Sequence, residues 1–252
     1  MSMKIAAENL KTLVDILKVL DVTDAQIKND IMCITNNAKT AIYYFKFPFT
    51  FSENFIITDV KQKIQAFKIL TDNFKKALYY DINDSECIFE SEDKKLRFES
   101  RIPILANEFV LDEFNELKTK DMQEIANLTI DVSELAKIYK LATVFKSAPR
   151  LKLDDKFARF YILSSDGNNE VQFDITGYNG EVKGTLDIDP MVFVLPFKTL
   201  QIAVKFDDNV YHLFSEGVLE NDIHVCIHNT ASLNEFGEIF DEQLEELSLE
   251  DL

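Results

Sequence analysis

The residues that most often carry catalysis or bind metals are few in this sequence. His224, Cys226 and His228 alternate within one apolar run, so in a strand they share one face. Same-face neighbours lie about 6.7 Å apart, which puts the two histidines about twice that distance from each other. A zinc ion with bonds of about 2.0–2.3 Å cannot easily hold all three. We interpret them as ordinary strand residues and expect no metal site.

No other set of residues suggests catalysis. His212, the remaining histidine, lies in a strand-like run without suggestive neighbours, and Asp187 and Asp189 flank a strand end, where a structural role is expected. The sequence has no GxGxxG or Walker motif, and its six glycines offer little material for a phosphate-binding loop. We therefore expect neither an enzyme nor a cofactor.

Composition is typical of a globular protein in a reducing compartment. The chain is 46% hydrophobic and 28% charged, as is usual for a globular protein. Its 252 residues are enough for one large domain or for two of about 110–125 residues. Cys33, Cys87 and Cys226 are odd in number and widely spaced, which argues against a disulfide framework. The first residues lack signal-peptide features, so we expect a cytoplasmic location, in the host cytoplasm if the protein is viral.

The net charge of −17 is concentrated in two segments. Residues 232–252 contain eight acids and no base, and residues 106–127 contain six acids against Lys118 and Lys120. Together these segments supply −12, which leaves about −5 for the remainder. Because exposed charges more than about 10 Å apart are largely screened, lysines on a separate face remain able to attract nucleic acid.

The elements that must position such lysines are repeated along the chain. Helical periodicity at 7–20 recurs at 133–146, where Ser133 is a plausible N-cap. At an offset of 125 residues, Ile5, Leu10 and Leu13 coincide with Ile130, Leu135 and Ile138. The two halves therefore look like copies of one unit.

Strand-like runs follow each helix. In the first half we expect strands at 26–35, 40–47, 55–57, 77–82, 87–90 and 96–102, with a helix at 59–70 that Thr58 caps. In the second half we expect strands at 157–163, 171–175, 182–188, 191–195, 202–206, 210–215 and 223–228, with a helical turn at 196–201. Pro48 should interrupt the alternating aromatic stretch that starts at Tyr43.

This order of elements resembles that of the DNA sliding clamps, the polymerase processivity factors. The likeness covers about residues 1–231 and is clearest from Ile130-Asp-Val-Ser-Glu-Leu to Ile223-His-Val-Cys-Ile-His. It looks closest to the clamps of tailed bacteriophages, with the proliferating-cell antigens more distant. The resemblance implies an α+β processivity-clamp fold with two similar domains of repeated β-α-β-β-β units, helices lining a ring and sheets outside. The domains would be 1–105 and 128–231, with an acidic connector at 106–127 and an acidic tail at 232–252.

The resemblance also implies a function and partners. Such a clamp encircles double-stranded DNA as a homotrimer, without reading its sequence, and tethers the replicative DNA polymerase. A clamp loader ATPase places it on DNA, and the clamp itself performs no catalysis and needs no cofactor, metal or membrane.

Lysines on the polar faces of the expected helices are the candidate DNA-facing residues. Mobile lysine charges suit weak, interchangeable phosphate contacts, and arginine is absent from these helices. The alternative is that each lysine is simply solvated. The candidates are Lys11, Lys18, Lys61, Lys63, Lys68, Lys137, Lys140, Lys146 and Lys198.

The resemblance places a partner-peptide pocket beneath the connector. Its candidate residues are Leu105, Phe109, Leu111, Val225 and Ile227. The tail carries a helical apolar stripe that includes Phe236, Phe240 and Leu247 among its acids. It is either a solvated tail, or a partner-docking helix or a mimic that shields the lysines or the pocket.

Two other functions remain open. One is a clamp-like processivity factor that binds DNA as a monomer or dimer, which would need a direct affinity that the net charge of −17 disfavours. The other is an acidic β-rich structural or adaptor protein unrelated to replication. Measurement of the oligomeric mass distinguishes the first alternative from a trimeric ring. A polymerase processivity assay distinguishes the second alternative from a clamp.

Overall fold

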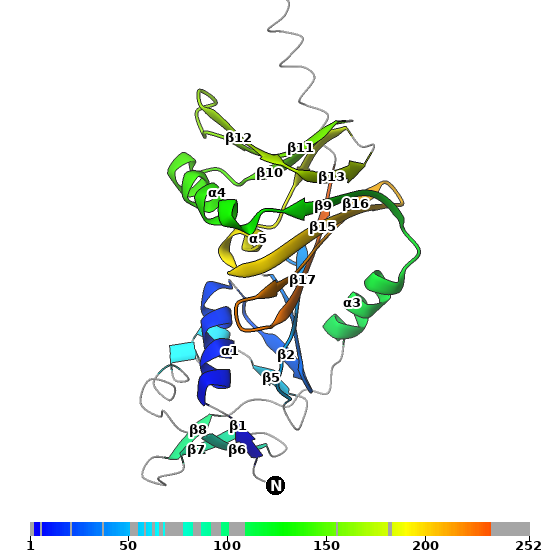
Figure 1. Cartoon of the computed structure of the whole chain (residues 1–252). Coiled ribbons are helices and arrows are strands. Elements are labelled where there is room, and N and C mark those ends of the chain that lie inside the picture. Colours follow the sequence, from blue (N-terminus) through cyan, green and yellow to red (C-terminus); the bar gives the residue numbers. More distant parts are fainter. Residues whose placement is uncertain are drawn as a thin grey trace, which may run out of the picture. The chain divides into compact units, whose positions relative to one another are not determined.

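The structure is a computed structural model of the 252-residue chain, and it describes most of the second half and parts of the first (Figure 1). The described residues are 3–5, 7–20, 22–36, 38–50, 55–57, 59–61, 64–65, 68, 78–82, 87–91, 97–100, 109–154, 156–180 and 183–232. They group into two compact units. Unit 1 runs to Lys120 and includes Val218–Ile227, and unit 2 comprises Asp121–Gly217 and the residues from His228 onward.

Unit 1 begins with a short strand and an amphipathic helix. Strand β1 (Met3–Ile5) precedes α1 (Ala7–Val19), which confirms the first predicted helix. Leu13, Leu17 and Leu20 recur at helical spacing and are buried. Their burial fixes which face of α1 is turned to solvent.

Four consecutively paired antiparallel strands follow α1. Its strands are β2 (Ala25–Lys28), β3 (Ile31–Thr35), β4 (Ala41–Lys46) and β5 (Phe55–Ile57), in the order β4-β3-β2-β5. The single strand predicted at 26–35 was wrong, because Lys28 pairs with Ile31 across a two-residue turn. Asn29 takes a φ of 55° in this turn, a conformation that asparagine tolerates better than most residues. As predicted, the aromatic strand ends before Pro48.

A second sheet of unit 1 has the order β1-β6-β7-β8. Its later strands are β6 (Leu78–Ile82), β7 (Cys87–Ser91) and β8 (Arg97–Ser100), close to the predicted ranges. Between the two sheets in sequence, the described residues of the predicted helix 59–70 are helical from Val60, with Val60 and Ile64 buried. Thr58, its predicted cap, lies outside the described residues.

Helix α3 (Phe109–Thr119) packs against β3 and β4 (Figure 1). Phe114, only 1% exposed, stacks on Tyr44 with ring centroids 4.8 Å apart and an interplanar angle of 11°. The range predicted as a connector therefore contains a helix that is anchored to the sheet by an aromatic pair.

Unit 2 repeats the helix and the four-stranded sheet. Strand β9 (Gln123–Ile130) leads into α4 (Val132–Phe145), which confirms the second predicted helix. The sheet that follows comprises β10 (Arg150–Asp154), β11 (Phe157–Leu163), β12 (Glu170–Ile175) and β14 (Gly184–Asp187), in the order β12-β11-β10-β14. Strand β10 was missed in the sequence. Helix α4 packs against β11, β15 and α5.

The remaining strands, most of whose residues belong to unit 2, follow the order β13-β9-β15-β16-β17. They are β13 (Gly177–Gly180), β15 (Phe197–Asp207), β16 (Val210–Leu219) and β17 (His224–Ala231), with the short helix α5 (Met191–Val194) before β15. The segment 177–180, between the predicted strands 171–175 and 182–188, is itself a strand. A Cβ on Gly180 would lie 2.8 Å from the Ala126 Cβ, so glycine allows β13 to approach β9.

Two assignments near α5 were reversed. The predicted strand 191–195 is a helix that begins after Pro190, where the Asp189 carboxylate accepts a hydrogen bond from the Met191 N–H (2.9 Å). The predicted helical turn 196–201 belongs to β15. Buried Phe197, Leu200 and Ile202 provide its inward side chains.

The two halves share one topology. In each, a strand and a helix are followed by three antiparallel strands, and a later strand pairs with the first of the three. The second half has one additional strand, β13, before that later strand. In each, a further helical segment precedes three more strands, and the first of these pairs with the opening strand of that half. The duplication predicted from the offset of 125 residues is therefore present in the sheet topology. No helix in the described part of the chain is long and apolar enough to span a membrane.

Candidate nucleic-acid interface

The exposed face of α1 is the first lysine-bearing surface. Lys11 and Lys18 are exposed and seven residues apart, which places them on one side of the helix, away from buried Leu13 and Leu17. The Lys18 Nζ lies 3.0 Å from an Asp15 carboxylate oxygen. This face therefore presents ammonium groups to solvent, one of them in contact with an acid of its own helix.

An aspartate fixes the start of α4. The Asp131 carboxylate accepts hydrogen bonds from the Ser133 N–H (3.0 Å) and the Ser133 hydroxyl (2.7 Å). These bonds hold the pKa of Asp131 below its ordinary value, because they stabilise the charged form. The predicted N-cap Ser133 was wrong by two positions, and Asp131 is the cap.

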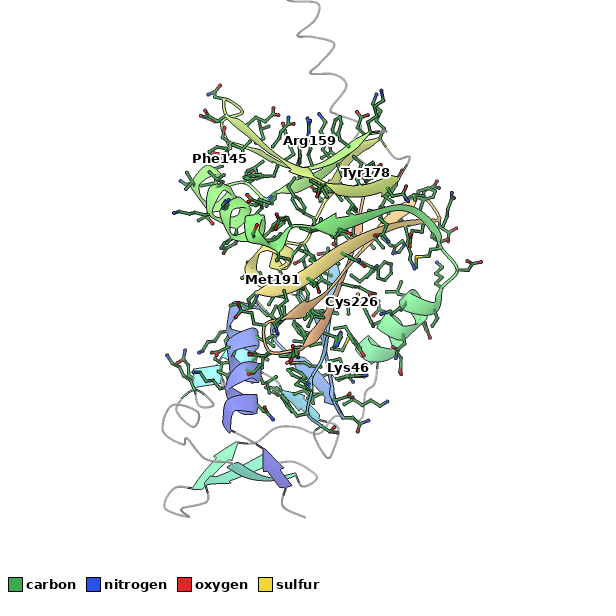
Figure 2. The ribbon with its side chains drawn as sticks, viewed as in Figure 1. Lys46, Phe145, Arg159, Tyr178, Met191 and Cys226 are labelled. Carbon is green, nitrogen blue, oxygen red and sulfur yellow. The ribbon has the colours of Figure 1, made fainter. Side chains whose placement is uncertain are left out.

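The exposed face of α4 is the second lysine-bearing surface. Leu135, Ile138 and Ala142 are buried, whereas Lys137 and Lys140 are exposed. The Lys137 Nζ lies 2.8 Å from a Glu134 carboxylate oxygen. The helix ends at Phe145, labelled in Figure 2. After it, exposed Lys146 adopts the left-handed conformation with a φ of 53°.

The other predicted lysines fall in three different settings. Lys61 and Lys68 are exposed at helical positions of the segment that starts at Val60. Lys63 lies outside the described residues. Lys198 is exposed, but it belongs to strand β15 and not to a helical turn, so its predicted place on a helix was wrong. The adjacent helix α5 carries no lysine.

These surfaces suit binding of phosphate without catalysis. Each exposed lysine offers a mobile point charge, and none of the described lysines in α1 and α4 lies in a buried, fixed geometry. Contacts of this kind attract any nucleic acid sequence and weaken as salt concentration rises.

The structure describes the predicted peptide-pocket residues only in part. Leu105 lies outside the described residues, and Phe109 and Leu111 fall within α3. Val225 and Ile227 on β17 are 3% and 0% exposed. The contact that anchors α3, Phe114 on Tyr44, was missed, although the spacing of Leu111, Phe114 and Leu117 is a helical signal within the acidic segment.

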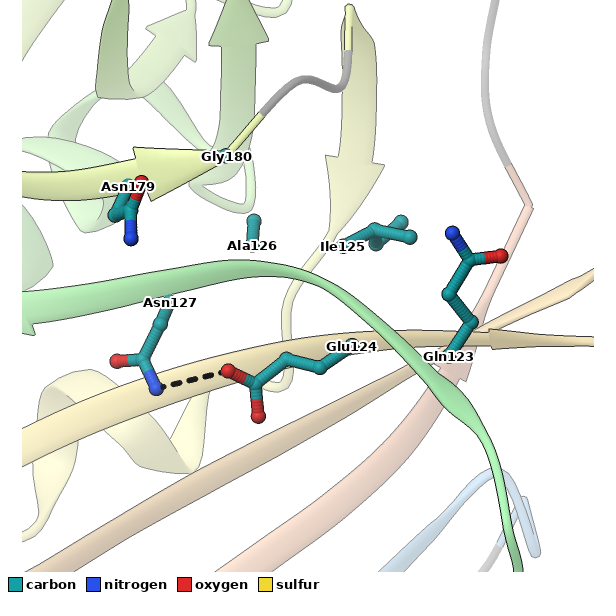
Figure 3. A pocket seen from close by; sticks show the side chains of 7 residues that line it. All are labelled: Gln123, Glu124, Ile125, Ala126, Asn127, Asn179 and Gly180. Atoms are coloured by element: carbon teal, nitrogen blue, oxygen red, sulfur yellow. Dashed lines mark hydrogen bonds between the residues drawn. The ribbon is translucent and has the colours of Figure 1, made fainter.

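A cavity of about 380 Å³ lies beside β9 and β13 (Figure 3). Among the lining side chains, the Asn127 amide donates a hydrogen bond to the Glu124 carboxylate at 3.4 Å. No predicted site residue borders it. Its lining residues are Gln123, Glu124, Ile125, Ala126, Asn127, Asn179 and Gly180.

Two histidines form a buried pair that sequence reasoning missed. The His212 Nδ1 lies 3.0 Å from the His228 Nε2, and the side chains are 7% and 4% exposed. Burial, and then the charge of His212, lowers the pKa of His228 to about 4. His228 is therefore neutral near pH 7, and the prediction that His212 has no notable neighbour was wrong. The ring of Phe214 lies 4.8 Å from that of His228.

Two of the cysteines are buried within the fold. Burial raises the pKa of the Cys33 thiol to about 12, so it stays protonated, and Cys226 is likewise buried. Across the described residues, no three His, Cys, Asp or Glu side chains are grouped so that they could hold a metal ion.

The comparisons with solved structures reveal the fold. A chain of the PCNA2–PCNA3 complex from Sulfolobus tokodaii superposes with a TM-score of 0.58 at 11% identity, over 92% of this chain and 99% of that one. A structure described as a DNA polymerase III beta subunit from Eubacterium rectale gives a TM-score of 0.61 at 14% identity, over 91% of this chain and 65% of that one. No family model and no curated protein matches the sequence.

At such low identities these likenesses establish the architecture alone. The superposition covers nearly the whole chain, and so does the repeated order of helices and strands. The chain therefore has the sliding-clamp fold, a mixed α+β architecture in which antiparallel strands predominate.

Proposed function

We propose that the protein is a DNA sliding clamp that encircles duplex DNA as a homotrimeric ring and tethers a replicative DNA polymerase. The clamp fold over nearly the whole chain carries this proposal. The exposed lysines on α1 and α4, the equivalent helices of the two halves, support it. In this role the protein performs no catalysis and needs no cofactor.

Retention on DNA follows from topology in this proposal. A closed ring cannot leave the duplex sideways, so it needs only weak contacts with phosphates. Lysines provide such contacts because each ammonium can exchange one phosphate for the next, and the sequences of α1 and α4 contain no arginine. The net charge of −17 favours this mode over tight direct binding by a monomer.

The partners follow from the same role. A clamp loader ATPase opens the ring, and the polymerase docks near the connector, where Leu105, Phe109 and Leu111 are proposed contacts. Val225 and Ile227 are buried and would give apolar support in place of exposed contacts. The clamp domains proposed for this arrangement are 1–105 and 128–231, and the kinship with bacteriophage clamps belongs to the proposal.

The lysine surfaces are tested by charge reversal. Lys61→Glu and Lys137→Glu should reduce processive synthesis on primed circular DNA with the cognate polymerase and loader, because each places a carboxylate where phosphate should bind. Lys39→Glu, at an exposed turn, is the matched control. The oligomeric mass should stay unchanged. Full processivity of both helix variants would remove these lysines from the DNA-facing surface.

A further inference from the structure

Two of the candidate DNA-facing lysines are held by acids of their own helices. The Lys18 Nζ lies 3.0 Å from Asp15 on α1, and the Lys137 Nζ lies 2.8 Å from Glu134 on α4. In both pairs the acid precedes the lysine by three residues, so both side chains project from the same exposed face. An approaching phosphate therefore meets a lysine that already has a carboxylate beside it.

Stability of the helix does not account for Asp15. Asp15 lies in the second half of α1, towards the negative end of the helix dipole, where a carboxylate is unfavourable. Its side chain is 53% exposed, and exposed pairs of this kind add little to folding. Its carboxylate accepts a hydrogen bond from the Lys18 ammonium, so Asp15 places a negative charge directly beside that lysine.

Glu134 has both a structural role and an electrostatic one. It lies in the first turn of α4, where a carboxylate favours the helix dipole. The side chains of Lys137 and Glu134 are 65% and 37% exposed, so the pair remains open to competition from solvent ions and phosphates. A unit charge this close acts well within the screening length of about 10 Å.

We propose that Asp15 and Glu134 limit the affinity of the lysine surfaces for DNA. Each carboxylate competes with a backbone phosphate for the ammonium group of its lysine and also repels the phosphate. The contact therefore stays weak enough for the protein to move along the duplex. This inference rests on the proposed function. In it the two acids do not touch DNA productively themselves, and they act by holding Lys18 and Lys137.

The test is neutralisation of each acid at constant side-chain size. Glu134→Gln and Asp15→Asn should tighten binding to a short duplex about two- to fivefold at low salt, with a steeper dependence of affinity on salt concentration. The double variant should tighten it further, and Glu134→Asp should behave like the wild type. Asp15 does not stabilise the start of a helix as Glu134 does. Asp15→Asn therefore tests the proposal even if Glu134→Gln destabilises α4.

Asp187→Asn is the matched control. Asp187 lies 3.1 Å from Arg150 in an exposed pair that joins two strands, so its loss changes the net charge equally without touching a helix. Its affinity for DNA should stay at the wild-type value. Equal tightening by Asp187→Asn would reveal a general charge effect and overturn the proposal.

A second readout separates this inference from the proposed function. Protein loaded on stretched DNA should diffuse more slowly when Glu134→Gln and Asp15→Asn are combined. Suppose that the wild type binds DNA and that Lys137→Glu lowers its affinity, but that neither Glu134→Gln nor Asp15→Asn raises the affinity. The acids then have no such role, and the proposed clamp function still stands. If the wild type has no salt-dependent affinity for duplex but supports processive synthesis, this inference fails and the clamp remains. If it also fails to support processive synthesis, the proposed function and this inference fail together.

Discussion

Phe114 and Tyr44 show how single side chains hold a segment that a polar composition would leave in solvent. The sequence around Phe114 is acidic, yet its ring is buried against the sheet of unit 1. Burial, with a smaller effect of the nearby Asp30 carboxylate, raises the pKa of Tyr44. The residue that matters most in this helix is thus its buried ring, while the charges around it remain exposed.

Removal of this ring should destabilise unit 1. Phe114→Ala should lower the free energy of unfolding by about 3 kcal/mol, because it removes a buried aromatic side chain and leaves a cavity. Urea denaturation measures the change. Val144→Ala, at a side chain that is 67% exposed, should stay within about 0.5 kcal/mol of the wild type. Equal small effects of both substitutions would show that α3 is not anchored by Phe114.

Helical spacing predicted which residues are exposed better than it predicted the contacts of the buried polar residues. The sides of α1 and α4 that carry Lys18 and Lys137 follow from helical periodicity alone. The contact between His212 and His228 depends on how β16 and β17 pair, which a sequence pattern does not specify. For the same reason, no local signal places Phe114 against Tyr44.

Among the secondary-structure elements, the sequence predicted the long helices accurately and the short strands poorly. The long amphipathic patterns gave α1 and α4 within two residues at each end. The run 191–195 is rich in β-branched and aromatic residues and was read as a strand. Pro190 and the Asp189 hydrogen bond start a helical turn there instead, and Pro196 ends it.

The buried histidine pair gives β16 and β17 a measurable pH response. In the unfolded chain His228 binds a proton below about pH 6.5, whereas in the folded state its pKa is about 4. The free energy of unfolding should therefore fall as pH drops from 6.5 towards 4, by about 3 kcal/mol from this residue.

The response is measured as a difference between variants, because carboxylates titrate over the lower part of the same range. His228→Gln should show a shallower fall of the unfolding free energy between pH 6.5 and 4 than the wild type. His224→Gln, at an exposed residue of the same strand, should keep the wild-type slope. Identical slopes for His228→Gln and the wild type would show that His228 is not buried in its neutral form.

For the whole molecule, duplication was the feature that the sequence carried most clearly. The offset of 125 residues that aligns Leu10 with Leu135 corresponds to two helices in equivalent places of one repeated topology. The strands β10 and β13 were not predicted: Arg150–Asp154 carries three charged residues around two leucines, and Gly177–Gly180 has the composition of a turn. Such strands form because their neighbours in the sheet pair with them.

Assembly is the property on which the account depends, because lysines on helices retain DNA topologically only when the subunits close around it. The direct measurement is the mass of the purified protein in solution by light scattering or sedimentation. A homotrimeric ring predicts a stable species of three times the chain mass of 29.1 kDa. A stable monomer across the micromolar range would contradict the ring and leave, at most, a clamp-like protein that binds DNA by direct affinity.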